Sequence, residues 1–150
     1  MIANLKKNKK KGFTMVELIV VIAIIAIIAA VAVPTTISYV QKARTNTALS
    51  ETSSVLNTIE TYFTDFAATG DGSIEATDLV TELDEMMPNV QHTTGITVVN
   101  NEDNTFTITV SSSQEGGAST KTYNADTYGF TIADCTLTAP SGEAGWTAAS

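Results

Sequence analysis

The feature that most constrains this chain is an unbroken apolar run near its start. Sixteen consecutive apolar residues extend from Leu18 to Val33. Counted from Phe13, the segment approaches the ~20 residues that a membrane-spanning helix requires. Five lysines between residues 6 and 11 precede it. Because positively charged flanks stay on the cytoplasmic side of a membrane, the pattern predicts a single span with its N-terminus in the cytoplasm.

The distribution of charge limits the partners of the rest of the chain. All sixteen carboxylates lie beyond Gly12 with only three of the eight cations, so the chain from Phe13 onward has a formal charge of −13. Nucleic acid requires a basic face for its phosphates, so no nucleic acid is expected as a partner. A body this acidic is soluble and self-repelling, which suits a domain displayed outside a cell.

The reactive side chains predict no catalytic or metal site. Cys135 is the single cysteine, so no intrachain disulfide can form, and with the single histidine, His92, it makes no zinc-binding spacing. No serine or cysteine nucleophile signature is present in the sequence. We therefore expect no enzymatic activity, no cofactor and no metal, and we expect Cys135 and His92 to be packing and surface residues.

The apolar run continues into an amphipathic pattern. Pro34 interrupts the run, and a proline inside a helix removes one hydrogen bond and usually causes a kink. Beyond it, apolar residues recur at steps of three and four. The pattern predicts one helix from about 14 to about 68, roughly 80 Å long at ~1.5 Å per residue. Ile37 and Val40 face one way, and the residues that recur later are Val55 or Leu56, Ile59, Tyr62 or Phe63, and Phe66.

A second helix is expected over residues 76–87. Glycines and an aspartate at 70–72 break the first helix, Ser73 or Thr77 caps the second, and Pro88 stops it. Its inward residues are expected to be Leu79, Val80, Leu83 and Met86 or Met87.

The remaining chain alternates with the period of strands. Strands are expected around 96–98, 105–111, near Tyr123, at 128–132 and at 135–139, with a turn at 101–104 and a flexible loop at 112–120. The tail is loop-like and is held by Trp146. The fold class is therefore α+β, a long N-terminal helix whose amphipathic half packs on a small antiparallel sheet. Such a sheet needs the helix because a few strands with one apolar face are marginal alone.

Residues 67–78 match the spacing of a calcium-binding loop in part. Placing Asp71 and Gly72 at its fifth and sixth positions puts Ala67 at the first, where the essential aspartate is missing. A turn between two helices is the favoured interpretation, and calcium remains the alternative.

Two simple interpretations of the N-terminus leave Glu17 unexplained. A secretory signal peptide would have a basic start, an apolar centre and cleavage after Ala30-Val31-Ala32, but its apolar region is normally about 7–15 residues long. A plain membrane anchor would favour leucine or valine at position 17, because an acidic side chain deep in lipid costs a few kcal/mol.

The stretch KKKGFTMVELIVVIAIIAIIAAVAVP resembles the N-terminus of the type IV prepilin family. The family pattern is a basic leader ending in glycine, then phenylalanine, a small hydroxyl residue, two further residues and glutamate, followed by an apolar helix. Gly12, Phe13, Thr14 and Glu17 match it in order and spacing, and Pro34 falls where the family commonly has a proline. The resemblance covers about residues 6–45 and agrees with the expected α+β fold.

The resemblance implies how the chain is processed. A membrane-embedded prepilin peptidase and methyltransferase would cut between Gly12 and Phe13 and methylate the new amine of Phe13. Residues 1–12 would be a cytoplasmic leader that is removed, 13–34 a transmembrane and filament-core helix, and 35–150 the amphipathic half of the helix with the α+β head. Glu17 would pair with the Phe13 amine of a neighbouring subunit, and Pro34 would let the helix loosen during assembly.

The implied function is that of a structural subunit of a type IV pilus, a surface filament for adhesion, twitching motility or aggregation. The alternative is a pseudopilin of a type II secretion or DNA-uptake system, and a third possibility is a tethered domain that does not assemble. The implied partners are further copies of the chain, minor pilins, the peptidase and an inner-membrane assembly platform. The chain would be a single-pass membrane protein before processing and part of an extracellular filament afterwards.

Overall fold

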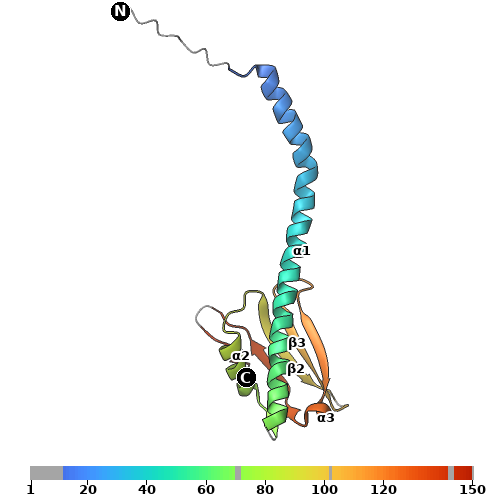
Figure 1. The fold of residues 1–150 in the computed structure, drawn as a ribbon, viewed down its shortest axis with the longest axis vertical. Coiled ribbons are helices and arrows are strands. Elements are labelled where there is room, and N and C mark those ends of the chain that lie inside the picture. The colour runs from blue at the N-terminus through green and yellow to red at the C-terminus, as the bar shows by residue number, and fades with distance from the viewer. Residues whose placement is uncertain (1–11, 70–71, 102, 142–143, 150) are drawn as a thin grey trace, which may run out of the picture. The chain divides into compact units, whose positions relative to one another are not determined.

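The computed structural model describes residues 12–69, 72–101, 103–141 and 144–149. Helix α1 (Met15–Thr69) is the long blue-to-green helix in Figure 1 and has almost the predicted bounds. The chain divides into two compact units between Val40 and Gln41, and each is described here by itself.

The first unit is the apolar part of α1. Every side chain from Gly12 to Val40 is exposed, including the whole apolar run from Leu18 to Val33. The helix continues through Pro34 without ending, as predicted. Its backbone forms the hydrogen bonds of an α-helix, whereas no other part of the described chain packs against its side chains.

The second unit contains the predicted antiparallel sheet. Its strand order is β4-β3-β2-β6-β7, and every neighbouring pair in it is antiparallel. The structure thus confirms the α+β class, with a five-stranded sheet following the long helix. The strands are β2 (Thr93–Asn100), β3 (Thr105–Ser112), β4 (Ser119–Asn124), β6 (Cys135–Thr138) and β7 (Thr147–Ala148).

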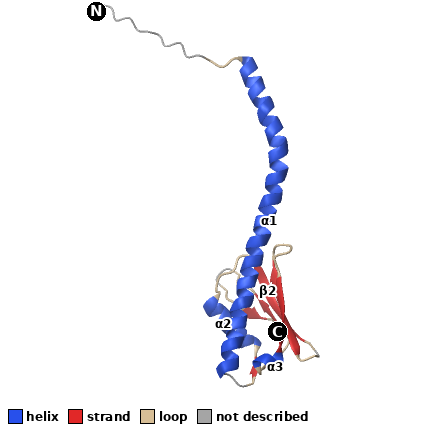
Figure 2. Ribbon diagram, turned by 45° about the vertical axis from the view of Figure 1, so that its right-hand side comes forward, coloured by secondary structure: helices blue, strands red, loops and turns tan. Residues whose placement is uncertain are grey.

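The core lies between one face of this sheet and the amphipathic half of α1, which runs alongside the strands in Figure 2. The Phe63 ring of α1 meets the Phe106 ring of β3 edge-on, with centroids 5.5 Å apart, and the Tyr123 ring of β4 at 5.8 Å. Burying an aromatic or aliphatic side chain of this size contributes about 1.5–3 kcal/mol. The predicted inward alternation of β3 is confirmed, because its buried residues are Phe106, Ile108 and Val110.

Helix α2 (Ala76–Met86) is confirmed, but its cap differs from the prediction. Neither Ser73 nor Thr77 caps it. Glu75 is the N-cap and forms a capping box with Asp78, whose Oδ2 accepts the Glu75 backbone N–H at 2.9 Å. Of the two alternative methionines at its end, Met87 packs on the core and Met86 is exposed.

The strand expected at 128–132 is wrong for most of its length. Residues 125–128 form the short helix α3 (Ala125–Tyr128), started by the Asn124 side chain, which accepts the Asp126 backbone N–H at 2.9 Å. Gly129 then ends the helix at φ 73°, a left-handed conformation that glycine adopts without steric cost. Only β5 (Thr131–Ile132) is extended, and it pairs in parallel with β1 (Ser73–Ile74), a pairing that was not predicted.

The segment 112–120 is not a free loop. Ser112 belongs to β3 and Ser119 to β4, and the residues between them are held against α1. The Thr52 hydroxyl of α1 donates to the Gly117 carbonyl at 2.7 Å. Gly117 also passes so close to Ala48 that an added Cβ would lie 2.7 Å from the alanine methyl.

Trp146 holds the tail, as predicted. Its side chain is 2% exposed, its indole N–H donates to the Met87 carbonyl at 3.0 Å, and its backbone N–H donates to Asp84 Oδ1 at 2.7 Å. The predicted break at residues 70–71, including the Asp71 of the calcium alternative, lies outside the described residues.

Candidate processing and assembly site

The predicted cleavage point lies just before the first turn of α1. Gly12 and Phe13 precede the helix in non-helical backbone, and the Phe13 side chain is 87% exposed. A Cβ added at Gly12 would meet no atom within 4 Å in the described chain. The Gly12–Phe13 peptide is therefore an open stretch of chain, as a peptidase substrate must be. The lysines of the leader lie outside the described residues.

Thr14 and Glu17 form a capping box at the start of α1. Glu17 Oε2 accepts the Thr14 backbone N–H at 3.1 Å and the Thr14 hydroxyl at 2.9 Å. In return, the Glu17 backbone N–H donates to Thr14 Oγ1 at 3.3 Å. Two N–H groups that the helix leaves unpaired are thereby satisfied. Sequence reasoning missed this role of Glu17, although the Thr-x-x-Glu spacing is its signature.

Glu17 lies in the first turn of α1 and Phe13 just before that helix, but no hydrogen bond joins the two residues, and Pro34, the other predicted assembly residue, lies well inside the helix. Within the described residues, the hydrogen bonds of the Glu17 side chain go to Thr14 through Oε2, and none reaches Phe13. The second carboxylate oxygen, Oε1, has no partner in this part of the chain. The site therefore presents one satisfied and one available oxygen.

Pro34 creates a weak point inside α1. Proline has no backbone N–H, so the carbonyl of Ala30, one turn earlier, loses its normal helical donor. Hydroxyl groups crowd the same region: Thr35 Oγ1 and Thr36 Oγ1 donate to the Ala32 carbonyl at 2.9 and 2.7 Å. Such back-bonding from Ser and Thr side chains bends helices and slightly weakens them.

The apolar half of α1 can bury its side chains in a membrane or against other helices. Its length and composition suit a membrane span, and none of that stretch is buried in the described chain. A contiguous apolar surface of this size marks an interaction site rather than a surface meant for water.

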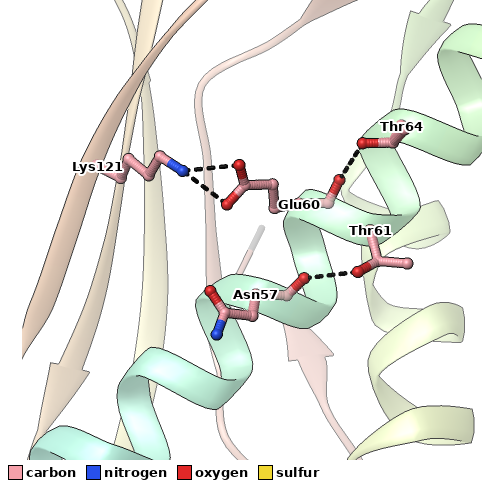
Figure 3. A network of polar contacts seen from close by, with 5 residues as sticks. All are labelled: Asn57, Glu60, Thr61, Thr64 and Lys121. Atoms are coloured by element: carbon pink, nitrogen blue, oxygen red, sulfur yellow. Dashed lines mark hydrogen bonds and ion pairs between the residues drawn. The ribbon is translucent and has the colours of Figure 1, made fainter.

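A polar contact ties α1 to the sheet on the head. Lys121 Nζ of β4 lies 2.7 Å from both carboxylate oxygens of Glu60, as Figure 3 shows. The same view shows the Thr61 and Thr64 hydroxyls donating to the carbonyls one turn earlier. Because both charged side chains are partly exposed, the ion pair is expected to contribute about 0–1 kcal/mol and to serve mainly as a positioning contact.

A second carboxylate on α1 holds the segment before β2. Glu51 accepts hydrogen bonds from the Gln91, His92 and Thr93 backbone N–H groups at 3.0, 2.8 and 2.7 Å, and from the Thr93 hydroxyl at 2.8 Å. Burial acts to raise the pKa of the Glu51 carboxyl, but these donors outweigh it and the pKa is lowered. No group of three or more His, Cys, Asp or Glu side chains in the described residues could hold a metal ion.

One comparison with known proteins matches, and it falls on this N-terminal segment. A family model described as the prokaryotic N-terminal methylation motif matches residues 7–33, which include Gly12, Phe13 and Glu17. No curated protein and no solved structure matches the chain. The motif points to a structural, pilin-type family and, with the exposed apolar helix, to membrane anchoring. Residues 7–33 are the type IV prepilin signature, which indicates a type IV pilin-like or pseudopilin protein.

Proposed function

We propose that the chain is the structural subunit of a type IV pilus. The observation that carries the proposal is a prepilin signature followed directly by an apolar helix with no buried residue up to Val40. A prepilin peptidase cuts between Gly12 and Phe13, and the new amine of Phe13 is methylated. The finished subunit then joins other copies through α1.

Cleavage changes where the helix can go. The leader carries five lysines, which hold that end of the chain at the cytoplasmic interface. Once they are removed, residues 13–34 can leave the lipid and enter a filament core made of the same apolar side chains. Residues 35–150 remain outside as the amphipathic half of the helix and the head.

Glu17 sets the axial position of one subunit relative to the next. A carboxylate without partners is penalised in a low-dielectric surround. The capping box with Thr14 satisfies Oε2 within the chain, and Oε1 remains for the cationic amine of a neighbouring Phe13. Cohesion comes mainly from the apolar faces, whereas the ion pair selects the axial offset at which the glutamate is satisfied.

Pro34 and its hydroxyl neighbours supply the flexibility that assembly requires. The missing hydrogen bond at Ala30 and the back-bonded hydroxyls of Thr35 and Thr36 both weaken the helix in one short region. The helix loosens there when lipid is replaced by neighbouring subunits. Assembly also engages minor pilins and an inner-membrane platform.

The test is an intact-mass and N-terminal analysis of protein sheared from the surface of the native cells. A filamentous product that starts at methylated Phe13 supports the proposal. Processed protein confined to the membrane fraction would assign the chain to the pseudopilins of a secretion or DNA-uptake system. A start after Ala32, or an uncut Met1, would exclude both assignments.

A further inference from the structure

The charged residues beyond the leader are distributed very unevenly along the chain. The stretch from Leu18 to Ser50 contains no Asp or Glu, but it contains Lys42 and Arg44. All carboxylates other than that of Glu17 lie beyond Ser50, together with a single cation, Lys121. An anionic surface repels such an acidic region and attracts the basic stretch. Contact with an anionic surface is therefore restricted to the part of α1 that follows the apolar run.

Lys42 and Arg44 have no anionic partner in the part of the chain that the structure describes. Both side chains are exposed on α1. The ion pair found among the described residues joins Lys121 to Glu60. The positive charges of Lys42 and Arg44 are therefore not neutralised within the described head, and both remain available to an external anion.

Arg44 borders a surface hollow between α1 and the turn that follows β3. The hollow has a volume of about 440 Å³ and is lined by Gln41, Arg44, Thr45, Gln114 and Glu115. The amide groups of both glutamines can donate hydrogen bonds to an anionic oxygen. The Glu115 carboxylate acts against an anion in the same hollow, but it is not within ion-pair distance of Arg44. The guanidinium of Arg44 thus keeps its donors.

The position of the two cations along α1 matches the outer edge of a lipid headgroup layer. A hydrocarbon layer requires ~20 helical residues, so a span that starts at Leu18, directly after the charged Glu17, ends at about Ile37. The headgroup layer adds about 5–7 Å, which is roughly four or five further residues of helix. Side chains of a helix lean toward its N-terminus, so those of Lys42 and Arg44 lean toward the lipid.

The two cations reach headgroups on opposite sides of the helix. They are two residues apart, which turns their side chains by about 200° around the helix axis. Tyr39, three residues before Lys42, is 75% exposed, and tyrosine is enriched where a span meets the membrane surface. The sequence around Lys42 thus has the residue types of a membrane–water interface.

We propose that Lys42 and Arg44 bind the phosphates of anionic lipid headgroups on the side of the membrane opposite the leader. A guanidinium binds a phosphate with two parallel hydrogen bonds and an ammonium binds it as a point charge, while the apolar stems of both side chains lie along the lipid. Each basic side chain at an anionic membrane surface favours binding about fivefold. This inference rests on the membrane anchoring of α1 and not on filament assembly.

Under the proposed function, this lipid contact acts after cleavage. Removal of the leader takes away five lysines, so Lys42 and Arg44 become the lysine and arginine side chains that flank the span. The processed subunit is then held at the far surface of the membrane, and its assembly must break the two phosphate contacts.

The experiment uses phosphatidylglycerol and phosphatidylcholine probes that carry the same photoreactive group in the headgroup. The full chain is placed in phosphatidylcholine bilayers at few chains per vesicle, and crosslinks are located by fragmentation of the intact chain. In wild type, the anionic probe is expected to crosslink to residues 35–50 about fivefold more than the zwitterionic probe at about 0.01 M salt, and less so at about 0.15 M. Trp146 fluorescence checks that each head is folded.

Three variants separate the charge of these two residues from other effects. Lys42→Gln/Arg44→Gln is expected to crosslink equally to both probes over residues 35–50. Lys42→Arg/Arg44→Lys keeps both charges and is expected to retain the preference for the anionic probe. The control Lys121→Gln removes an exposed cation elsewhere on the head and is expected to behave like wild type.

Equal crosslinking of the two probes in wild type would overturn the inference, as would a preference that Lys42→Gln/Arg44→Gln retains. A preference abolished by inorganic phosphate, but not by chloride at the same ionic strength, would assign the cations to free phosphate and overturn the lipid assignment. The measurement requires neither cleavage nor assembly. Failure of the pilus proposal would therefore leave its result unchanged.

Discussion

Glu17 Oε2 lies 2.9 Å from Thr14 Oγ1 and 3.1 Å from the Thr14 backbone nitrogen, so the glutamate proposed to register subunits also caps its own helix. The two roles use different atoms of one carboxylate. Capping occupies Oε2 and leaves Oε1 for a partner outside the described chain. The two roles can therefore be separated by substitutions at Thr14 and at Glu17.

Replacing Glu17 by alanine is expected to abolish filament assembly without preventing cleavage. The cleaved peptide lies at Gly12–Phe13, whereas the substitution removes the carboxylate that pairs with the neighbouring amine. Processed protein should accumulate in the membrane fraction and be missing from the sheared fraction, as measured by immunoblotting and intact mass. Glu115→Ala, on an exposed loop of the head, is the control and should assemble normally. Normal yields of sheared Glu17→Ala filaments would contradict the registration role.

Replacing Thr14 by alanine is expected to loosen the first turn of α1. Losing an N-cap side chain costs about 1 kcal/mol of helix stability, and the Thr14 hydroxyl bonds to both the carboxylate and the backbone N–H of Glu17. Hydrogen exchange of the Glu17 and Leu18 amides should accelerate roughly fivefold, which corresponds to about 1 kcal/mol. Thr14→Ser keeps the hydroxyl and should exchange like wild type. Equal protection in Thr14→Ala and wild type would exclude the capping role.

The contacts of Glu51 predict a pH-dependent stability of the head. The pKa of this carboxyl is lowered in the folded state, so its contribution is present above the ordinary glutamate value of about 4.3 and is lost as the pH falls through the folded value. Urea unfolding of the full chain in detergent, followed by Trp146 fluorescence, should show Glu51→Gln less stable than wild type at pH 7. The difference should shrink as the pH falls below about 4. Glu85→Gln, at an exposed position of α2, should show no such convergence, and a constant difference for Glu51→Gln would refute this account.

The sequence could predict the elements with long periodic patterns, but not the contacts between distant residues. The long helix and β3 follow from periodic apolar residues, and their patterns extend over enough residues to exclude other structures. The bonds from Glu51 to the backbone of residues 91–93 could not be predicted, because backbone N–H groups some 40 residues away leave no mark in the sequence. The capping box at Thr14 was predictable, since Thr-x-x-Glu is a recognised helix-start pattern.

The wrong strand at 128–132 has a different cause. Apolar residues at Tyr128, Phe130 and Ile132 imitate the alternation of a strand, but Tyr128 ends a short helix and Gly129 has a positive φ. All three side chains are packed at the core even so, because a helix end followed by a tight turn can direct them inward as well as a strand does. The pattern correctly predicted burial and incorrectly predicted the backbone conformation.

Substitutions at Gly145 and Asp84 are expected to have non-additive effects on the stability of the head. A Cβ at position 145 would lie 2.5 Å from Asp84 Oδ1, the atom that accepts the Trp146 backbone N–H at 2.7 Å. Gly145→Ala must therefore displace the aspartate and break its bond, at a cost of about 1–3 kcal/mol. Asp84→Ala loses the same bond directly and should cost a similar amount.

The double variant Gly145→Ala/Asp84→Ala distinguishes this coupling from two independent effects. With the aspartate side chain removed, the new methyl group has room and no bond remains to be broken. The double variant should therefore be no less stable than Asp84→Ala alone, which gives an interaction energy of about 1 kcal/mol or more in a double-mutant cycle. Urea unfolding followed by Trp146 fluorescence measures all four proteins. Costs that simply add would show that Gly145 and Asp84 do not interact.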